Sequence, residues 1–166
     1  MTARKIMLLG EIGVGKSSIA RRLVFDRFEG DYKPTIGVDV YSYDVEDAPG
    51  DEGSRFVIWD TDGNLGETIL AHIYMKEAAG AFIVGDVTRP STLKRMVELG
   101  NKFMDAMPGR YCAFLLNKSD LETAATELPP ELAKSAIPML RTSAKTGENV
   151  KDAFLRAADA IRRRGI

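Results

Sequence analysis

The sequence is poor in the residues that form disulfides and metal centres. Its 166 residues include one cysteine and one histidine. A single cysteine excludes a disulfide within the chain and fits a reducing compartment. The same scarcity leaves no cluster of cysteine and histidine that would suggest a zinc site. Cys112 itself stands inside the apolar run YCAFLL, so we expect it to be part of the core.

Long hydrophobic runs and an excess of one charge are also missing. No stretch approaches the roughly 20 consecutive apolar residues of a membrane span, and the N-terminal MTARK does not lead into a signal-peptide pattern. With 24 acidic and 23 basic residues the formal charge is −1, so no global field draws the chain to nucleic acid. We therefore expect a cytoplasmic, monomeric protein without a nucleic-acid partner.

The C-terminal residues IRRRGI lack a cysteine that can carry a prenyl or acyl chain. No lipid anchor is therefore expected at this end of the chain as given. Arg162, Arg163 and Arg164 are expected to solvate a helix end, and contact with an anionic surface is the alternative.

What the chain does have is a regular alternation of short apolar runs and amphipathic helical patterns. Its length allows one domain, residues 1–166, that buries roughly two-thirds of the unfolded surface. The runs at 81–84 and 112–116 are apolar on both alternating faces, as in parallel strands covered by helices on both sides. Residues 93–103 and 150–161 show the spacing of helices with one buried face. The alternation predicts an α/β fold with a doubly wound, mostly parallel sheet.

The interval between residues 37 and 60 breaks this alternation. The segment GVDVYSYDVEDAPGDEGSRFVIWD has two strand-like halves joined by turn-forming residues at 48–54. It predicts an antiparallel hairpin that adds a strand to the edge of the sheet. Open sheets of this kind bind ligands at the carboxyl ends of their strands, so we expect the functional residues in the loops there.

The segment GEIGVGKS lies between a predicted strand and a predicted helix, and it matches the phosphate-loop pattern. Gly10, Gly13 and Gly15 let backbone N–H groups turn inward around the oxygens of a polyphosphate. Lys16 brings a positive charge to the outer phosphates, and the hydroxyl of Ser17 can bind Mg²⁺. A chance glycine-rich turn is the alternative.

Two later segments indicate guanine as the base. In NKSD the carboxylate of Asp120 can accept hydrogen bonds from the ring N–H and the amine of guanine, a pair of donors that adenine lacks. Lys118 can lie across the base plane, and Asn117 can connect neighbouring loops. In TSAKTG the backbone N–H of Ala144 can meet the guanine oxygen. Both segments, in this order after a phosphate loop, favour GTP or GDP as the ligand.

Two segments between the phosphate loop and NKSD predict a sensor of the terminal phosphate. In DYKPTIG, Thr35 can offer a hydroxyl to Mg²⁺ and an N–H to the γ-phosphate, contacts that end when this phosphate is lost. In WDTDGN, Asp60 can hold Mg²⁺ through water, and Gly63 lets the backbone approach the γ-phosphate. A helix cap at Asp60 and an ordinary turn at 34–37 are the alternatives.

In their order along the chain, the five motifs resemble those of the Ras superfamily of small GTPases, and the resemblance covers nearly the full length of the chain. TIGVD and WDTDG are most similar to the Rab branch. The resemblance implies a three-layer P-loop fold with a six-stranded sheet and five helices, and a site for GTP or GDP with Mg²⁺. It also implies switch segments near 30–40 and 60–76 that bind an effector, with an exchange factor and an activating protein as further partners. The missing lipidation cysteine weakens a vesicle-anchored role.

The resemblance also implies which residues form the site. Phe28 matches the position whose ring packs beside the guanine, and Tyr32 matches the tyrosine that closes over the phosphates. The residues implied to contact the nucleotide are Gly13, Val14, Gly15, Lys16, Ser17, Ser18, Phe28, Tyr32, Thr35, Gly63, Asn117, Lys118, Asp120, Leu121, Ser143, Ala144 and Lys145. Those implied to act in hydrolysis are Lys16, Thr35, Gly63 and Asn64. Those implied to bind Mg²⁺ are Ser17, Thr35 and Asp60.

Three positions depart from the family pattern. Asn64 replaces the usual glutamine that orients the attacking water, and its stem is shorter by one methylene, where a misplacement of about 1 Å can cost ~10²-fold in rate. Asp62 replaces a common alanine and adds negative charge near the triphosphate. Ile12 replaces a small residue and obstructs both the water and an arginine from an activating protein. We expect nucleotide binding to survive and hydrolysis to be slow.

Two other functions fit part of the pattern. A GTP-binding module with negligible hydrolysis is favoured by Ile12 and Asn64, although the intact Lys16, Thr35 and Asp60 leave the chemistry possible. A phosphoryl-transfer kinase would need a second-substrate site and usually an arginine-bearing lid, and the sequence shows neither. A regulatory GTPase is the leading hypothesis. Candidates for an apolar effector-facing patch, with core or strand positions as the alternative, are Ile36, Val38, Trp59, Tyr74 and Met75.

Overall fold

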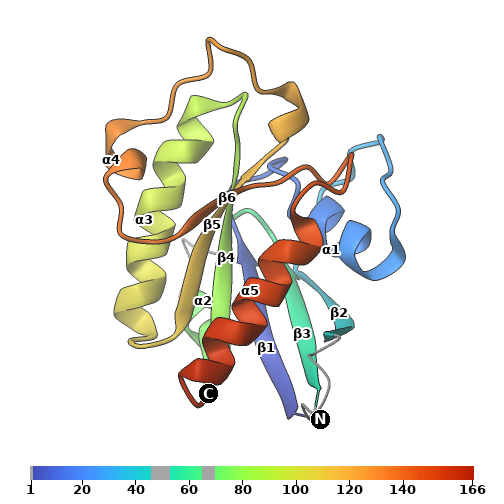
Figure 1. Cartoon of the computed structure of the whole chain (residues 1–166), viewed down its shortest axis with the longest axis vertical. Helices are drawn as coiled ribbons and strands as arrows, with labels where there is room; N and C mark the ends of the chain where they lie inside the picture. The colour runs from blue at the N-terminus through green and yellow to red at the C-terminus, as the bar shows by residue number, and fades with distance from the viewer. Residues whose placement is uncertain (1, 46–52, 65–69) are drawn as a thin grey trace.

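The computed structural model describes residues 2–45, 53–64 and 70–166. Within them, one sheet has the strand order β2-β3-β1-β4-β5-β6, between two layers of helices (Figure 1). The strands are β1 (Thr2–Leu9), β2 (Val38–Val45), β3 (Ser54–Thr61), β4 (Ala78–Asp86), β5 (Tyr111–Asn117) and β6 (Met139–Arg141). The helices are α1 (Lys16–Phe25), α2 (Leu70–Met75), α3 (Pro90–Ala106), α4 (Pro130–Ala133), α5 (Val150–Arg163) and the short 3₁₀ helix η2 (Ser119–Leu121).

The sheet is parallel except at one edge. β1 pairs in parallel with β3 and β4, and β4, β5 and β6 continue in parallel. β2 runs antiparallel to β3, with Val38 opposite Thr61 and Val45 opposite Ser54. The predicted α/β fold and its antiparallel edge strand are therefore confirmed, whereas most of the predicted turn at 48–54 lies outside the described residues. Near that turn, Arg55 forms two hydrogen bonds with Asp44 across the hairpin, at 2.6 and 2.8 Å.

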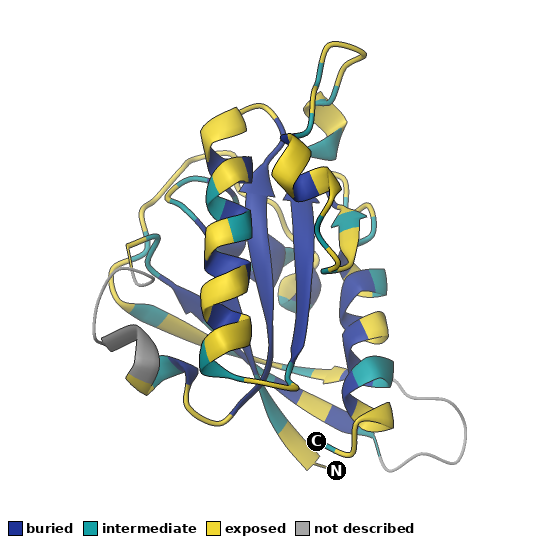
Figure 2. Ribbon diagram, turned by 90° about the vertical axis from the view of Figure 1, so that its left-hand side faces the viewer, coloured by how far each residue is buried: buried dark blue, intermediate teal, exposed yellow. Residues whose placement is uncertain are grey.

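The central strands are enclosed by helices on both faces. Every residue of β4 and β5 is buried, and Figure 2 shows both strands dark blue behind the helices. This is the reason for the continuous apolar runs at 81–84 and 112–116, since neither face of these strands meets water. Cys112 on β5 is 5% exposed, and burial raises the pKa of its thiol to about 12. The predicted core position of this cysteine is confirmed.

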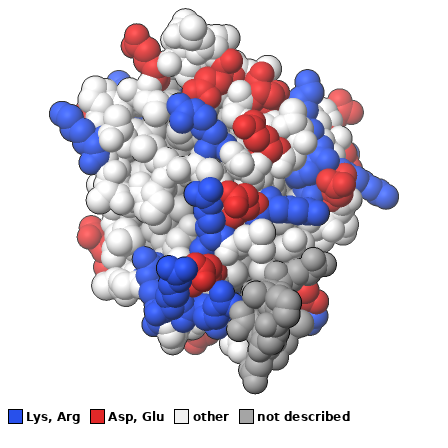
Figure 3. Space-filling view, in the orientation of Figure 1, with Lys and Arg blue, Asp and Glu red and all other residues white. Residues whose placement is uncertain are grey.

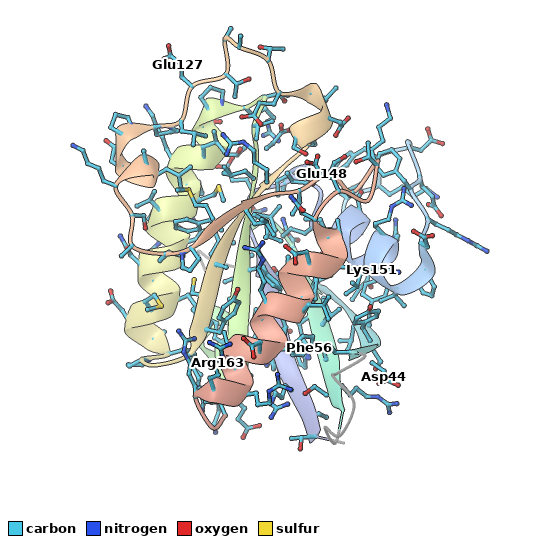
Figure 4. All side chains as sticks on the ribbon, in the orientation of Figure 1. Asp44, Phe56, Glu127, Glu148, Lys151 and Arg163 are labelled. Carbon is cyan, nitrogen blue, oxygen red and sulfur yellow. The ribbon has the colours of Figure 1, made fainter. Side chains whose placement is uncertain are left out.

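The face covered by α1 and α5 contains an aromatic cluster. The ring of Phe154 on α5 lies 4.8 Å from that of Phe82 and 6.1 Å from that of Phe56, measured between centroids. Figure 4 shows Phe56 beside α5 on β3. The residues of α5 predicted to face inward are all at most 2% exposed, namely Val150, Ala153, Phe154, Ala157 and Ile161.

The opposite face is covered mainly by α3. Leu93, Met96 and Phe103 point their side chains into this second core cluster. Gly100 allows the close approach, because a Cβ there would lie 2.8 Å from the ring of Phe114 on β5. The helices on both faces thus fix the sheet, and the loops after β1, β3, β4, β5 and β6 converge at its carboxyl edge.

Charges of both signs are interspersed on the face seen in Figure 3, with basic side chains gathered near the C-terminal end of α5. Two of them pair within the helix: Arg162 and Arg163 lie 3.1 and 2.8 Å from the carboxylate of Asp159. Positive side chains in a last helical turn also complement the helix dipole. Among the helices that the structure describes, none combines the length and the apolar character needed to cross a bilayer.

Candidate functional site

The phosphate loop connects β1 to α1. Gly15 has φ 102°, a left-handed conformation that favours glycine. A Cβ at Gly15 would also collide with Nδ2 of Asn117, so this position has room for no side chain. The amide of Asn117 donates a hydrogen bond to the carbonyl of Val14 at 2.9 Å. Asn117, at the end of β5, therefore fixes the phosphate loop where the loop leads into α1.

Lys16 is the first residue of α1 and is 6% exposed. Its ammonium donates hydrogen bonds to the carbonyls of Gly10 at 2.7 Å and Glu11 at 2.8 Å. Burial lowers the pKa of Lys16 to about 8, while the carboxylates of Asp60, Asp62 and Glu11 act in the opposite direction. A cation held by neutral carbonyls beside a helix N-terminus is suited to bind the outer oxygens of a polyphosphate.

Three oxygen-bearing side chains from separate segments meet beside Lys16. The hydroxyl of Ser17 lies 2.7 Å from that of Thr35 and donates to Oδ2 of Asp60 at 2.5 Å. Asp60 is fully buried, and its Oδ1 has no hydrogen-bond partner among the described residues. Burial raises the pKa of this carboxyl. Hydroxyl and carboxylate oxygens are the ligands that Mg²⁺ prefers, and the buried Oδ1 needs a partner, so the set fits this ion.

Asn117 joins three parts of the site. It is 1% exposed, and besides its bond to the phosphate loop it accepts hydrogen bonds from the hydroxyl of Thr142 and the N–H of Ala144, both at 3.3 Å. These bonds connect the end of β5 to the loop after β6. The predicted connecting role of Asn117 therefore has a direct counterpart in the geometry.

The neighbouring residues of NKSD are positioned in the same way. Lys118 donates to the carbonyl of Gly13 at 2.9 Å and lies 2.7 Å from Oδ2 of Asp86 at the end of β4. Asp120 accepts a hydrogen bond from the hydroxyl of Ser143 at 2.7 Å, which fixes the direction of its carboxylate. The segments NKSD and TSAKTG are thus one interlocked unit.

Arg22 on α1 supports this unit and was missed by the sequence analysis. Its guanidinium donates to the carbonyls of Ala144 at 2.8 Å and Lys145 at 2.6 Å. The same group bonds to Asp26 one turn later in the helix. Arg22 belongs to none of the motifs and contacts only backbone in the loop, so no pattern of residue types marks it.

The segment with the unusual residues lies against the phosphate loop. A Cβ on Gly63 would lie 2.5 Å from N and 2.6 Å from Cγ1 of Ile12, so the backbone at Gly63 rests on this isoleucine. The N–H of Asn64 donates to the carboxylate of Asp62 at 2.9 Å, and Asn64 is exposed. The N–H of Asp62 donates to the carbonyl of Gly37, which joins the two switch segments. Residues 65–69 of the second switch lie outside the described residues.

The candidates for an apolar patch separate into exposed and buried residues. Ile36 is 91% exposed, whereas Met75 is 5% exposed and belongs to the core, which was the alternative for these residues. The short helix α2 turns Met75 toward the sheet, a direction that the sequence did not indicate. Trp59 and Tyr74 are partly buried and pack with ring centroids 5.9 Å apart. Other exposed apolar side chains near the switches are Val40 at 54% and Ile73 at 63%.

These loops enclose a cavity of about 580 Å³, within the range for small-molecule sites. The sequence-predicted residues that line it are Gly13, Gly15, Lys16, Ser17, Ser18, Phe28, Tyr32, Thr35, Gly63, Asn64, Asn117, Lys118, Asp120, Leu121, Ala144 and Lys145. Val14, Asp60 and Ser143 are buried behind the wall and contribute through their bonds to Asn117, Ser17 and Asp120.

A family model described as Ras family matches residues 5–163. The chain belongs to the Ras family. Over 164 residues it is 34% identical to Ras-related protein RABF2a of Arabidopsis thaliana, covering 96% of this chain and 81% of that protein. It is 36% identical over 160 residues to Ras-related protein Rab-31 of Homo sapiens, with 90% and 78% covered. Ras-related protein Rab5A of Oryza sativa subsp. japonica is 35% identical over 156 residues, with 90% and 75% covered.

Membership of the Ras family makes this chain a GTP-binding switch and a GTPase, and the names of its relatives make it Rab-like. Ras-family proteins bind guanine nucleotides and act through effectors, exchange factors and activating proteins. The leading hypothesis from the sequence is confirmed at this level. Nothing in the described residues or among these relatives favours the kinase alternative.

Proposed function

We propose that residues 1–166 form a single nucleotide-binding domain that holds GTP or GDP with Mg²⁺ in the cavity and hydrolyses GTP slowly. The observation that carries the slow rate is the contact between Ile12 and Gly63. It places a branched side chain against the segment that carries Asn64, the residue at the water-orienting position. Each part of the site supports one part of this proposal.

The phosphate end offers cations and N–H groups. The ammonium of Lys16, held by two neutral carbonyls, is free to exchange these for phosphate oxygens, which form stronger, charge-assisted hydrogen bonds. Mg²⁺, when bound, neutralises charge on the outer phosphates. Ser17 and Thr35 would hold it directly and Asp60 through water, which the proximity of their oxygens supports. Thr35 then joins the state of the first switch to the ligand.

The guanine end offers a fixed carboxylate. Asp120, oriented by Ser143, would accept the ring N–H and the amine of the base, and the N–H of Ala144 would meet its oxygen. Lys118 and Phe28 lie on the cavity wall at positions that can cover the base plane. A base without the two donors would leave the Asp120 carboxylate unpaired, and this is the physical ground for choosing guanine.

The rate of hydrolysis depends on Asn64 and Ile12, two positions at which the chain departs from the family pattern. Asn64 has the right amide, but its shorter stem must reach the water past Ile12, which is 46% exposed and faces the cavity. Lys16, Thr35 and Gly63 remain available for the terminal phosphate. The expected outcome is tight binding with slow turnover, and an effector would recognise the ordered switches through exposed side chains such as Ile36.

The direct test is single-turnover hydrolysis of GTP by the double variant Ile12→Gly, Asn64→Gln, compared with the unmodified protein. We expect a gain on the order of 10²-fold, because the change removes the obstruction and restores the reach of the amide. Affinity for GDP should stay unchanged, since the loop acts through backbone N–H groups. No gain in rate would overturn this account of Ile12 and Asn64. Failure of the unmodified protein to bind GDP would overturn the site itself.

A further inference from the structure

Arg89, at the start of α3 and outside all the motifs, contacts the phosphate loop from outside the residues that line the cavity. Its Nη1 donates a hydrogen bond to the carbonyl of Ile12 at 2.8 Å. The same Nη1 is 3.3 Å from the position that a Cβ on Gly13 would take, and a ring carbon of Tyr32 is 3.9 Å from that point. Ile12, Gly13 and Tyr32 all line the cavity. The guanidinium of Arg89 therefore lies against the phosphate loop, and the ring of Tyr32 approaches the same point of the loop.

The turn that carries Arg89 is firmly held. Asp86, at the end of β4, accepts hydrogen bonds from the N–H and the hydroxyl of Thr88 and, through its carbonyl, from the N–H of Arg89. The hydroxyl of Thr92 donates to the carbonyl of Arg89, and Pro90 begins α3 directly afterwards. Asp86 and Thr92 are buried at 0% and 1% exposure. The side chain of Arg89 therefore starts from a fixed point, which reduces the entropic cost of placing its guanidinium.

Arg89 differs from the two lysines of the site in the partners that its side chain has. Lys118 is already paired with Asp86, and the ammonium of Lys16 donates to the carbonyls of Gly10 and Glu11. Across the described residues, no carboxylate lies within ion-pair distance of Arg89. Its hydrogen bond to the carbonyl of Ile12 uses one of the five N–H donors of the guanidinium. A guanidinium that is bound only to an exposed, neutral carbonyl can exchange it for phosphate oxygens, which form stronger bidentate bonds.

The side chain of Ile12 affects an arginine from a partner protein differently from an arginine within the chain. The isoleucine narrows the approach by which a partner would insert an arginine beside the phosphate loop. Arg89 needs no such approach, because it reaches the loop from within the chain and is anchored on the Ile12 carbonyl, not on its side chain. The bulky side chain of Ile12 and the guanidinium of Arg89 thus meet at the same residue of the phosphate loop.

We propose that Arg89 is a catalytic residue supplied within the chain, which contacts the terminal phosphate of bound GTP and stabilises the charge that develops during hydrolysis. The inference rests on the proposed function of the cavity. In the reaction, water forms a bond to the γ-phosphorus, the bond to the β–γ bridging oxygen breaks, and the proton of the water goes to the released phosphate. Arg89 stays protonated throughout and donates hydrogen bonds to the oxygens that gain charge.

The test uses Arg89→Ala and Arg89→Lys, with Lys94→Ala as the matched control. Lys94 is an exposed cation one turn further along α3 and outside the nucleotide cavity. Two quantities are measured on the Mg²⁺-loaded protein: the single-turnover rate with GTP, and the rise in melting temperature when aluminium fluoride is added to the GDP complex. Aluminium fluoride with GDP imitates the planar phosphoryl group in transfer, so it reports contact with that group without turnover.

For Arg89→Ala we expect a rate lower on the order of 10²-fold and loss of the aluminium fluoride response, with GDP affinity unchanged within about threefold. Arg89→Lys should be intermediate, because it keeps the charge but not the planar fork, and Lys94→Ala should match the unmodified protein. The proposal is overturned if Arg89→Ala keeps both readouts, or if it loses GDP binding, which would make Arg89 a structural part of the loop. If the unmodified protein binds GDP tightly but shows neither GTP hydrolysis nor an aluminium fluoride response, the role of Arg89 is overturned and the nucleotide site stands. If the unmodified protein does not bind GDP, both the role of Arg89 and the nucleotide site are overturned.

Discussion

The two ends of the cavity differ in how they are held and in how closely they follow the family pattern. At the guanine end, side chains of Asn117, Lys118 and Ser143 form hydrogen bonds to other parts of the site, and Arg22 holds the last loop from α1. At the terminal-phosphate end, the exposed Asn64 extends from a segment that rests on Ile12. The chain thus combines interlocked side chains at the proposed guanine end with residues that depart from the family pattern at the proposed site of hydrolysis.

The difference between the two ends of the cavity concerns nucleotide affinity on one side and the rate of GTP hydrolysis on the other. Binding energy is the sum of many contacts, and a rigid frame of buried hydrogen bonds keeps those contacts in place. Hydrolysis depends on a water and a few groups placed to within about 1 Å, so we expect the shorter amide of Asn64 and the bulk of Ile12 to affect the rate and not the affinity. Residue changes at the two ends should therefore have different consequences.

The largest effect is expected from Asp120→Ala at the guanine end. Loss of two hydrogen bonds to a carboxylate, at roughly 1.5–3 kcal/mol each, should weaken GDP binding on the order of 10²- to 10⁴-fold. Equilibrium titration with a fluorescent GDP measures this, and Glu127→Ala, an exposed carboxylate outside the cavity, is the control. Retained affinity in Asp120→Ala, with ATP still excluded, would show that another group selects the base.

A matched pair of asparagines compares the two ends directly. Asn117→Ala leaves buried partners on Val14 and Ala144 without their bonds, so the free energy of unfolding should fall by about 2–3 kcal/mol. Asn64→Ala removes an exposed side chain and should change it by less than about 0.5 kcal/mol. Urea denaturation of the two variants gives both values. Equal losses in stability would mean that the two ends are held alike.

A smaller effect is expected from Arg22. Arg22→Ala frees the carbonyls of Ala144 and Lys145, and GDP dissociation should be faster by about 30-fold if each of the two bonds contributes roughly 1 kcal/mol. Arg22→Lys should recover little, because an ammonium cannot reproduce the planar fork that meets both carbonyls. Stopped-flow displacement of fluorescent GDP measures the rate. If the lysine variant behaves as the unmodified protein does, positive charge alone holds the loop.

The sequence was sufficient where function depends on residue type at a fixed spacing. It predicted the phosphate loop, both guanine segments and the two sensor residues, and the break in the alternation between residues 37 and 60 indicated the antiparallel strand. It was insufficient where a side chain binds distant backbone. Arg22 and Arg89 reach carbonyls 122 and 77 residues away in the chain, and any sequence offers such carbonyls everywhere. The sequence also left open whether Met75 is in a surface patch or in the core, since six residues of helix do not define a buried face.

We infer that this chain binds guanine nucleotide as its family does but hydrolyses GTP slowly. The most direct measurement is single-turnover hydrolysis of GTP by the Mg²⁺-loaded protein and by Asn64→Gln, with the affinity for GTP determined on the same preparations. We expect tight binding in both, slow turnover in the unmodified protein and faster turnover in the variant. Rapid turnover that Asn64→Gln leaves unchanged or lowers would contradict it.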